Sequence, residues 1–353
     1  MRFLLAGGGT GGHVNPLLAL AENLRNTGHE AIALGTKEGL EARLVPQRGF
    51  ELLTIARLPL PRKASLAALV FPIRLVIASL RVLQIIKQRK VQAVIGFGGY
   101  ASAPAYLGAW LAKVPIVVHE ANARAGFANK LGAKLTKHVA ICFPNTDLSP
   151  AKLVGMPLRQ EFQGAERIDK QQARVELGLD PSLPTLLVTG GSQGARSINL
   201  AVEQARTDLR AAGIQVLHIV GPVAGLNEVS EAGYKRIIYC DAMSAAIAAS
   251  DFAISRAGAS TVSEFTALSL PALYVPYPVG NGEQRFNVEQ VVSVGGGLVV
   301  EDAELSASFI AERVIPIMSH RQTLEQMSRS AGSVAILDAT AQLQAMLLNA
   351  VNT

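Results

Sequence analysis

The chain has 353 residues, which is enough for two domains, and its formal net charge is +6. It is 49% hydrophobic but only 5% aromatic, as is typical of α/β domains. The positive charge favours an anionic partner, but no basic run with interleaved aromatic residues occurs, so nucleic acid is the least favoured. Cys142 and Cys240 lie in apolar runs without a Cys/His cluster, which argues against a structural zinc site and for the reducing cytoplasm.

The chain opens on a glycine-rich loop between a predicted strand and a predicted helix. Arg2–Ala6 is a short apolar run, too short for a signal peptide, and five glycines follow within Gly7–Gly12 before His13. Helical apolar spacing covers Val14–Gly28, with the helix expected to begin near Pro16. This order lets a phosphate approach bare backbone N–H groups at the positive end of a helix dipole. The same glycines would also suit a tight turn that binds nothing.

Further strands of the first half are predicted at Glu30–Gly35, Phe50–Ile55, Val91–Phe97, Val114–Val118 and His138–Cys142. Their alternation with helical segments indicates a parallel sheet. A second glycine loop, Gly96–Ser102, closes one of these strands, and His119-Glu120-Ala121-Asn122 follows another. Because the carboxyl ends of parallel strands meet at one edge of the sheet, we expect a ligand site there. The alternative for His119 and Glu120 is a local structural hydrogen bond.

The segment 57–90 carries eight Lys or Arg residues and no acidic residue. Leu66–Ile86 is long enough to span a bilayer, but a proline and two arginines interrupt it, which favours an amphipathic or docked helix. Two interpretations stay open. One is a surface near Arg62–Arg81 that rests on anionic lipid, with Arg62–Phe71 as its best part. The other is a crossover helix, with Ile73–Ile86 packed on the sheet.

The second half repeats the order of strand, glycine-rich loop and helix that opens the first half. Leu153–Glu161 crosses into it, Asp169–Gly178 is helical, and a glycine loop at Gly190–Ala195 again joins a strand to a helix. Strands are predicted at Pro184–Gly190, Ile214–Gly221, Ile237–Asp241, Phe252–Ser255 and Ala272–Val275. We therefore expect two Rossmann-like domains with parallel sheets that face each other across a cleft.

The domain boundaries follow from this pattern. We expect residues 1–158 to form the first domain and residues 159–334 the second. Thr323–Leu348 is predicted to be helical, and its end, about 335–353, is expected to pack back on the first domain.

Two loops of the second half carry groups suited to a nucleotide. In Ser255–Glu264 a strand ends in glycine and small hydroxyl residues, so Ala259–Thr261 can offer N–H and hydroxyl donors to a diphosphate. Glu264 can accept both hydroxyls of a ribose, or can serve as a partner of the helix dipole. In the turn at Tyr277–Asn287, Glu283 and Gln284 are placed to bind sugar hydroxyls.

Seven motifs now stand in order along the chain, and together they resemble one family. The chain is similar over essentially its whole length to the MurG family of peptidoglycan N-acetylglucosaminyltransferases, glycosyltransferase family 28, which has the GT-B fold. The motifs are GGGTGGH at Gly7–His13, GFGGYAS at Gly96–Ser102, HEANA at His119–Ala123, GMPLR at Gly155–Arg159, GGSQGA at Gly190–Ala195, RAGASTVSE at Arg256–Glu264 and GNGEQ at Gly280–Gln284.

The resemblance implies a reaction at the cytoplasmic face of the cell membrane, by a peripherally attached enzyme. N-acetylglucosamine moves with inversion from UDP-GlcNAc to the muramoyl 4-hydroxyl of undecaprenyl-pyrophosphoryl-MurNAc-pentapeptide (lipid I), giving lipid II. It implies an acceptor site in the first domain and a donor site mainly in the second. The implied donor contacts are Thr10, Gly11, Gly12, Asn122, Arg159, Ser192, Cys240, Ala259, Ser260, Thr261, Val262, Ser263, Glu264 and Gln284.

This chain departs from the family pattern at a few positions. Ala121 and Ala123 replace a glutamine and a glycine, Met156 replaces an asparagine, and Glu283 stands where a glutamine often contacts the sugar. These changes affect the details of sugar recognition rather than the reaction.

The reaction needs a base for the acceptor hydroxyl and neutralisation of the leaving UDP. No Asp-x-Asp motif is evident, so we expect neither a metal nor a cofactor, and Arg159 with backbone N–H groups would neutralise the charge. His13 is the first candidate for the base, because a nearby helix N-terminus disfavours its protonated form. Glu120 is the second.

Three other functions remain open at this stage. One is another lipid-directed UDP-sugar glycosyltransferase of the same fold. A second is an NAD-dependent dehydrogenase, because Gly7-x-Gly9-x-x-Gly12 matches the dinucleotide fingerprint, although Gly35-Thr36-Lys37 stands where that fold needs an acid and Glu38 comes late. A third is a non-catalytic membrane-docking module, against which the ribose-binding second half argues.

Overall fold

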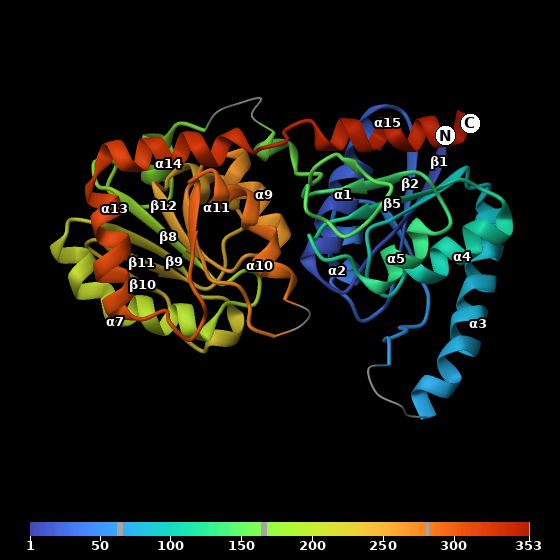
Figure 1. Cartoon of the computed structure of the whole chain (residues 1–353), viewed down its shortest axis with the longest axis horizontal. Helices are drawn as coiled ribbons and strands as arrows, with labels where there is room; N and C mark the ends of the chain where they lie inside the picture. Colours follow the sequence, from blue (N-terminus) through green and yellow to red (C-terminus); the bar gives the residue numbers. More distant parts are fainter. Residues whose placement is uncertain (62–65, 164–167, 280–281, 353) are drawn as a thin grey trace. The chain divides into compact units, whose positions relative to one another are not determined.

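The computed structural model describes residues 1–61, 66–163, 168–279 and 282–352. Contacts divide the chain into two compact units (Figure 1). The first unit combines Met1–Arg159 with Asp338–Thr353, and the second is Gln160–Leu337. Each unit is built around its own sheet, so each is described by itself.

The described part of the first unit contains a seven-stranded sheet in the order β3-β2-β1-β4-β5-β6-β7, in which every pair is parallel. The strands are β1 (Arg2–Ala6), β2 (Glu30–Gly35), β3 (Glu51–Thr54), β4 (Ala93–Gly96), β5 (Ile116–Glu120), β6 (Val139–Ile141) and β7 (Lys152–Leu153). The helices are α1 (Gly11–Asn26), α2 (Glu41–Gln47), α3 (Leu66–Arg89), α4 (Ser102–Ala112), α5 (Phe127–Ala133) and α15 (Ala339–Asn352).

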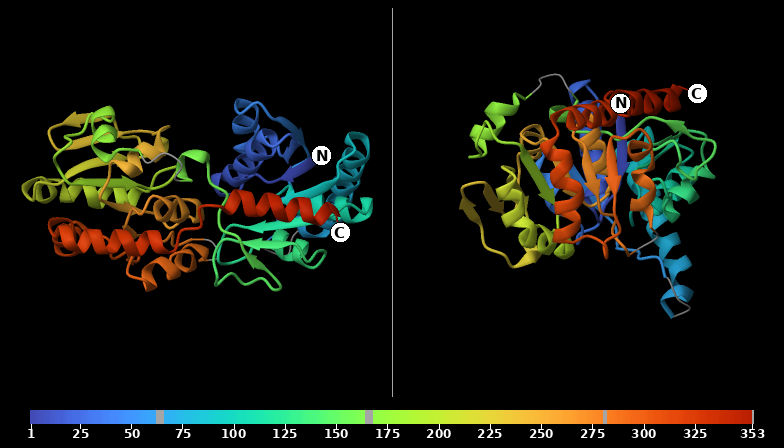
Figure 2. Two further views of the ribbon diagram at one scale, coloured as in Figure 1. Left: turned by 90° about the horizontal axis from the view of Figure 1, so that it is seen from above. Right: turned by 60° about the vertical axis from the view of Figure 1, so that its left-hand side comes forward.

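Alternation along the strands separates two cores, one on each face of this sheet. Leu4 and Val118 belong to the core covered by α3 and α4, whereas Phe3 and Val117 belong to the core covered by α1. The last helix closes the second core, because α15 contacts α1, β4 and β5 and buries Leu343 completely (Figure 2). The C-terminal segment is therefore part of the first unit.

Helix α3 is only partly packed. Its buried apolar residues are Ala78, Val82, Ile85 and Ile86, which join the core on the α4 side of the sheet. A second face of the helix is exposed, and its apolar side chains recur every three or four residues, so they form one stripe. The side chains of this stripe, here called the α3 stripe, are Leu69 (75% exposed), Ile73 (62%), Val76 (56%), Ile77 (61%) and Leu80 (51%).

The expectation that Ile73–Ile86 packs on the sheet is therefore confirmed for one face of the helix, to which the partly buried Leu75 also belongs. The other face carries the α3 stripe and is exposed along the same length. Arg62 and Lys63, which belong to the predicted membrane surface, lie outside the described residues.

The described part of the second unit also has a seven-stranded sheet, in the order β10-β11-β9-β8-β12-β13-β14. The strands are β8 (Thr185–Thr189), β9 (Gln215–Ile219), β10 (Val229–Glu231), β11 (Tyr234–Ile237), β12 (Phe252–Ser255), β13 (Ala272–Tyr274) and β14 (Gly297–Val299). The α-helices are α6 (Lys170–Glu176), α7 (Arg196–Ala211), α8 (Met243–Ala248), α9 (Ala259–Ala267), α10 (Glu283–Asn287), α11 (Glu289–Ser293), α12 (Ala307–Phe309), α13 (Ile315–Ser319) and α14 (Arg321–Ser333). The 3₁₀ turns are η1 (Gln160–Phe162) and η2 (Pro222–Ala224), and η3 (Ile310–Val314) is a π-helical turn.

Several predicted boundaries in this unit are wrong. The strand expected at Ile237–Asp241 is β11, which ends at Ile237 and pairs with β10 in an antiparallel hairpin. The single helix expected over Thr323–Leu348 is broken between α14 and α15, since the chain passes from one unit to the other at Asp338. Both errors arise because apolar spacing locates a segment but not its ends.

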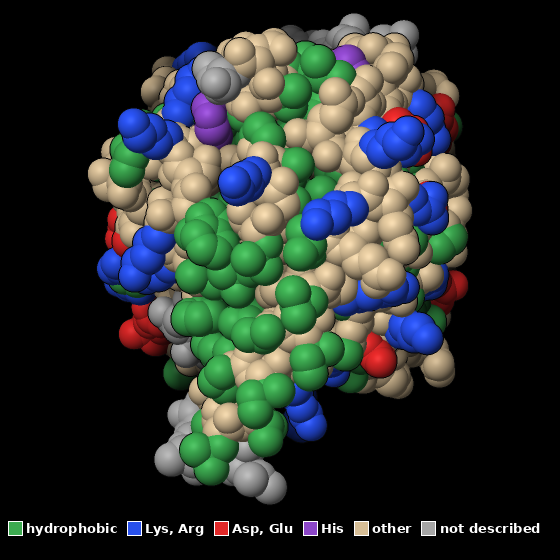
Figure 3. Space-filling view, turned by 90° about the vertical axis from the view of Figure 1, so that its right-hand side faces the viewer, with side chains coloured by type: hydrophobic (Ala, Val, Ile, Leu, Met, Phe, Trp, Pro, Cys, Tyr) green, Lys and Arg blue, Asp and Glu red, His purple; other side chains and the backbone are tan. Residues whose placement is uncertain are grey.

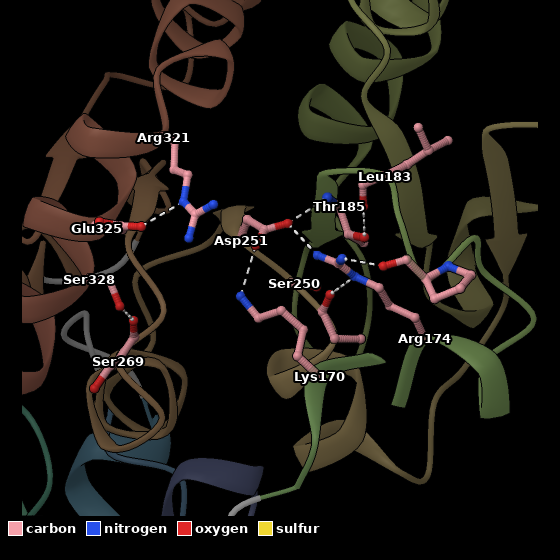
Figure 4. Close-up of polar contacts among 12 residues, drawn as sticks. Lys170, Arg174, Leu183, Thr185, Ser250, Asp251, Ser269, Arg321, Glu325 and Ser328 are labelled. Carbon is pink, nitrogen blue, oxygen red and sulfur yellow. Dashed lines mark hydrogen bonds and ion pairs between the residues drawn. The ribbon is translucent and has the colours of Figure 1, made fainter. Parts of the chain in front are cut away.

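A buried ion pair fastens α6 to the sheet of the second unit (Figure 4). Arg174 donates to Asp251 at 2.6 Å, with side chains only 8% and 19% exposed. The same guanidinium donates to the backbone carbonyls of Ala249 and Pro181, and Asp251 also accepts the N–H of Thr185. The pair thereby joins α6 to the starts of β8 and β12.

We expect Asp251→Ala to lower the free energy of unfolding of the second unit by about 3 kcal/mol, because it leaves the Arg174 guanidinium buried without its counter-charge. Urea unfolding followed by circular dichroism measures this. Glu325→Ala is the matched control, since it breaks the exposed Arg321–Glu325 pair drawn in the same figure and should leave the midpoint unchanged. Equal midpoints for both variants would contradict the role of the buried pair.

Candidate functional site

The first glycine loop leads directly into α1. Helix α1 begins at Gly11 rather than near Pro16, so Gly11, Gly12 and His13 form its first turn. Thr10 is the N-cap in an extended conformation, and its carbonyl accepts the N–H groups of His13 and Val14, both at 3.1 Å. The glycines thus place His13 at the N-terminal end of α1, beside the carboxyl edge of the sheet.

A carboxylate that sequence analysis missed fills the concave side of this loop. Glu41 is fully buried, and it accepts the N–H of Gly9 and both the N–H and the hydroxyl of Thr36, each at 2.8 Å. A Cβ added at Gly8 or Gly39 would lie 2.3 or 2.1 Å from a Glu41 oxygen. Gly8 in this loop, and Gly39 before α2, therefore make room for the Glu41 side chain rather than for a ligand.

His13 presents one ring nitrogen to the site. Its Nδ1 lies 3.0 Å from the carbonyl oxygen of Gly8 and 3.3 Å from the Thr10 hydroxyl. Because a carbonyl can only accept, Nδ1 carries the proton, and Nε2 of the neutral ring keeps its lone pair. That Nε2 faces the loop after β4, since a Cβ added at Gly98 would lie 2.9 Å from it.

Glu120 lies at the end of β5, not after it, and is 3% exposed. Its carboxylate accepts the N–H groups of Asn122 (2.9 Å) and Gly126 (3.0 Å) and the amide of Asn129 (2.9 Å). Burial raises the pKa of Glu120, and these three donors oppose that shift. The carboxylate therefore holds the loop 121–126 in place, which favours His13 over Glu120 as the base.

His119, the neighbouring residue, is completely buried and lies within β5. Its Nε2 is 3.0 Å from the carbonyl oxygen of Gly155, which ties β5 to the segment that contains Met156 and Arg159. Burial lowers the pKa of His119 to about 4, so the ring is neutral at pH 7. Of the described residues, none bonds its Nδ1.

In the second unit, the loop Gly190–Gly194 turns the chain from β8 into α7. Gly191 and Gly194 have φ angles of +82° and +81°, which favour glycine, and Gly191 donates to the Thr189 hydroxyl. A Cβ at Gly194 would lie 2.0 Å from the carbonyl oxygen of Val220. Ser192 is exposed at the tip of this loop.

Helix α9 begins beyond β12 with Gly258 as its N-cap. Ala259 and Val262 are buried at 5% and 2% exposure, so they can meet a ligand only through their backbone. Thr261, Ser263 and Glu264 are partly exposed. The hydroxyl oxygen of Ser260 is buried and has no partner among the described residues, which marks it as a group that a ligand could satisfy.

Gln284 has a scaffolding role that the sequence did not indicate. Its side-chain oxygen accepts the N–H groups of Tyr277 at 2.9 Å and Ala257 at 3.2 Å, so α10 is tied to the loops after β12 and β13. Asn287 reinforces this by donating to the carbonyl of Ala257. Gln284 is left with its amide NH₂ group to meet a sugar.

Sequence analysis also missed Arg256 as a residue of this site. Its guanidinium pairs with Asp302 and donates to the Ser197 hydroxyl at 3.1 Å and to the carbonyl of Val275 at 3.2 Å. These contacts join the start of α7 to three loops at the carboxyl edge of the sheet. The signal in the sequence was the position of Arg256 directly after a buried strand.

The remaining predicted residues are also placed. Cys240 follows β11 in a loop, partly buried, and burial raises the pKa of its thiol. Asn122 donates its N–H to Glu120, and Arg159, partly exposed, ends the first segment of the first unit. Thus Thr10, Gly11, Gly12, His13, Glu120, Asn122 and Arg159 belong to the first unit, and the other candidates belong to the second. The described residues include no group of three His, Cys, Asp or Glu side chains that could hold a metal ion.

Comparison with known proteins agrees with this division. The model described as "Glycosyltransferase family 28 N-terminal domain" matches residues 3–141, and "Glycosyltransferase family 28 C-terminal domain" matches residues 185–343. The relative from Clavibacter sepedonicus is 51% identical over 99% of this chain and 96% of its own, and that from Streptomyces coelicolor is 47% identical over 99% and 98%. Both are named UDP-N-acetylglucosamine–N-acetylmuramyl-(pentapeptide) pyrophosphoryl-undecaprenol N-acetylglucosamine transferase. The crystal structure of Acinetobacter baumannii MurG has a TM-score of 0.80 at 26% identity and covers 99% of both chains.

A buried histidine behind the second glycine loop makes stability depend on pH. His218 bonds to the Tyr234 hydroxyl and to Asn199, which donates in turn to the carbonyl of Val220 beside Gly194. Burial lowers the pKa of His218 from 6.5 to about 4. Between these values the unfolded chain binds more protons, so the stability due to neutral His218 is complete above pH 6.5 and is lost as the pH falls toward 4.

We therefore expect the free energy of unfolding to fall on acidification with a contribution from His218 of up to about 1.4 kcal/mol per pH unit. His218→Gln should remove that contribution, so its stability should fall less steeply than that of the wild type. Urea unfolding at several pH values between 7 and 4.5 measures both slopes. Parallel slopes would show that His218 does not titrate in this range.

Proposed function

Because the chain belongs to glycosyltransferase family 28, we propose that it transfers N-acetylglucosamine from UDP-GlcNAc to the muramoyl 4-hydroxyl of lipid I. The products are lipid II and UDP. The observation that carries this proposal is the identity of 42% to 51%, over nearly the full chain, with relatives named for this transfer.

The reaction is an in-line displacement at the anomeric carbon of the donor sugar. The bond from this carbon to the UDP oxygen breaks as the acceptor oxygen forms a new bond on the opposite face, so the configuration inverts. The acceptor hydroxyl loses its proton to a base. The diphosphate of UDP leaves with added negative charge that the protein must stabilise.

His13 is the base in this proposal. Its Nε2 carries the lone pair because Nδ1 donates to the carbonyl of Gly8, and its place in the first turn of α1 holds the ring beside the carboxyl edge of the sheet. Glu120 has the supporting role of holding the loop that contains Asn122.

The donor is bound mainly by the second unit in this proposal. The first N–H groups of α9, together with the Ser260 hydroxyl, would contact the diphosphate. Glu264 would accept the ribose hydroxyls, and Arg159 would add positive charge. Ser192, Cys240 and Gln284 would complete the contacts to the uracil and the sugar.

We expect His13→Ala to lower kcat by about 10²- to 10⁴-fold without changing donor affinity, because it removes only the base. Glu264→Ala should instead weaken UDP-GlcNAc binding by about 10- to 100-fold, because two hydrogen bonds to a charged acceptor are lost. Transfer from labelled UDP-GlcNAc to a short-chain lipid I analogue measures the first effect, and calorimetry the second.

Glu325→Ala, on the exposed surface of α14, is the control for both variants. Wild-type donor affinity in Glu264→Ala would rule out the ribose contact, and full turnover in His13→Ala would rule out this base. Transfer to another polyprenyl-linked acceptor, with none to the lipid I analogue, would select a different lipid-directed glycosyltransferase activity.

We further propose that the enzyme attaches peripherally to the cytoplasmic face of the membrane through the α3 stripe. Figure 3 shows a band of hydrophobic side chains on this side of the molecule, with Lys and Arg side chains on its flanks. Trp110 and Leu111 of α4, which are 58% and 45% exposed, extend the apolar surface next to α3. Apolar side chains that dip into lipid between cations are typical of interfacial attachment.

By length and composition alone, Ala68–Arg89 could also cross a bilayer. Two features favour attachment at the surface. Arg74 and Arg81 are exposed on the helix, and its C-terminal half is packed in the core of the first unit. An interfacial helix uses only the exposed stripe and leaves that packing intact.

We expect the double variant Ile73→Ser with Ile77→Ser to lose at least tenfold in affinity for vesicles that contain anionic phospholipid, because each isoleucine contributes about 1–2 kcal/mol when buried in lipid. Vesicle sedimentation measures this. The matched control is Val175→Ser with Leu200→Ser in the second unit. It removes two apolar side chains that are each 56% exposed, which is close to the exposure of Ile73 and Ile77. Vesicle binding that is unchanged in the α3 variant would place the membrane contact elsewhere.

A further inference from the structure

Arg57 is an exposed cation held in a defined position. It follows β3, and its neighbours Ile55 and Leu58 are both buried at 7% exposure, so the backbone around it is anchored in the core. Its guanidinium stacks over the ring of Tyr100 at 4.8 Å and donates to the Tyr100 hydroxyl at 3.2 Å. The side chain is therefore oriented before any ligand arrives.

The charge of Arg57 is not neutralised by a close carboxylate. Across the described residues it makes no ion pair, whereas other exposed cations of this unit do, as in Arg48–Glu22, Arg89–Glu51 and Lys130–Asp147. Glu38 and Glu41 act on it only at longer range. The Glu41 carboxylate also already accepts hydrogen bonds from the N–H groups of Gly9 and Thr36.

Arg57 lies between the first glycine loop and the segment that leads into α3. Tyr100 lies between Arg57 and the first glycine loop, because a Cβ added at Gly9 would be 3.9 Å from its ring. All three residues follow the carboxyl ends of parallel strands, at the edge that also holds His13. In the other direction the chain continues from Arg57 into α3, which carries the exposed apolar stripe.

One donor of the first glycine loop is not available to an additional anion. The N–H of Gly9 is already bonded to the Glu41 carboxylate, and a second anion there would meet like charge. A cation from outside the loop would therefore favour a diphosphate that binds near it. Of the described side chains, the Arg57 guanidinium is the one that stacks on the tyrosine covering Gly9.

We propose that Arg57, oriented by Tyr100, binds the diphosphate that joins the lipid chain of the acceptor to its sugar. This rests on the proposed function, since it requires an acceptor with an apolar chain, a diphosphate and a reacting hydroxyl in that order. The planar guanidinium can donate two parallel hydrogen bonds to phosphate oxygens, which an ammonium cannot do. Arg57 is then a binding residue that sets the distance between lipid and base.

The test compares Arg57→Ala, Arg57→Lys and Tyr100→Phe in transfer to a soluble, short-chain lipid I analogue. We expect Arg57→Ala to raise the KM for the acceptor by about 10- to 100-fold while the KM for UDP-GlcNAc stays within twofold. Arg57→Lys should recover part of this loss, because it restores the charge but not the paired donors. Tyr100→Phe, which keeps the ring and loses the hydroxyl, should have a smaller effect than Arg57→Ala.

The matched control is Arg25→Ala. Arg25 is also an exposed arginine stacked on an aromatic ring, at 4.4 Å from the centre of the Phe50 ring. Arg25 lies at the end of α1, and Phe50 directly precedes β3, so this pair is at the opposite edge of the sheet. The Arg25→Ala variant removes one positive charge from the same unit, and its KM for the acceptor should equal that of the wild type.

Three outcomes would overturn the proposal. They are an acceptor KM that is unchanged in Arg57→Ala, a rise in the donor KM instead, and a loss of binding to anionic vesicles with the acceptor KM unchanged. The last would assign Arg57 to lipid headgroups.

If the wild type transfers nothing to the lipid I analogue, the proposed function fails, and calorimetry with geranyl diphosphate decides this inference separately. If geranyl diphosphate binds more weakly to Arg57→Ala than to the wild type and to Arg25→Ala, a diphosphate site at Arg57 is supported. Equal binding, or none to the wild type, rejects it.

Discussion

The loops at the carboxyl edges of both sheets are held by buried or partly buried side chains that bond to the backbone of neighbouring loops. A loop without regular structure leaves N–H and C=O groups that are costly to bury without partners. Glu41 supplies acceptors for Gly9 and Thr36, Glu120 for the loop 121–126, and Gln284 for Ala257 and Tyr277. These contacts shape the ligand-facing loops in the absence of a ligand, so binding need not order them.

The two glycine-rich halves resemble each other in sequence but differ in charge. In the first unit, the internal carboxylate of Glu41 already occupies the N–H of Gly9. In the second unit, α9 begins with the buried, unpartnered Ser260 hydroxyl. This difference is consistent with the proposal that the second unit binds the nucleotide diphosphate and that Arg57 of the first unit binds the anionic acceptor. Each unit can then select its own substrate.

Helix α3 has a buried face and an exposed face. One face buries Val82 and Ile85 in the core of the first unit, whereas the other exposes Ile73 and Ile77. Exposed side chains of this size in a row are uncommon on a soluble surface. The same helix thus anchors the domain and presents an apolar surface next to the segment that carries Arg57, which is the arrangement that a substrate embedded in lipid requires.

The α/β class, most strands of both sheets and the family could be predicted from local sequence patterns, and these predictions are confirmed. Short apolar runs between glycine loops leave few alternatives to parallel strands, and seven ordered motifs identify a family. Three features emerge only from the folded molecule: Glu41 bonds to the first glycine loop, Glu120 and Gln284 hold loops, and the α3 stripe is exposed. The physical reason is that hydrogen bonding and burial depend on partners distant in the chain, such as Glu41 for Gly9, which no local pattern encodes.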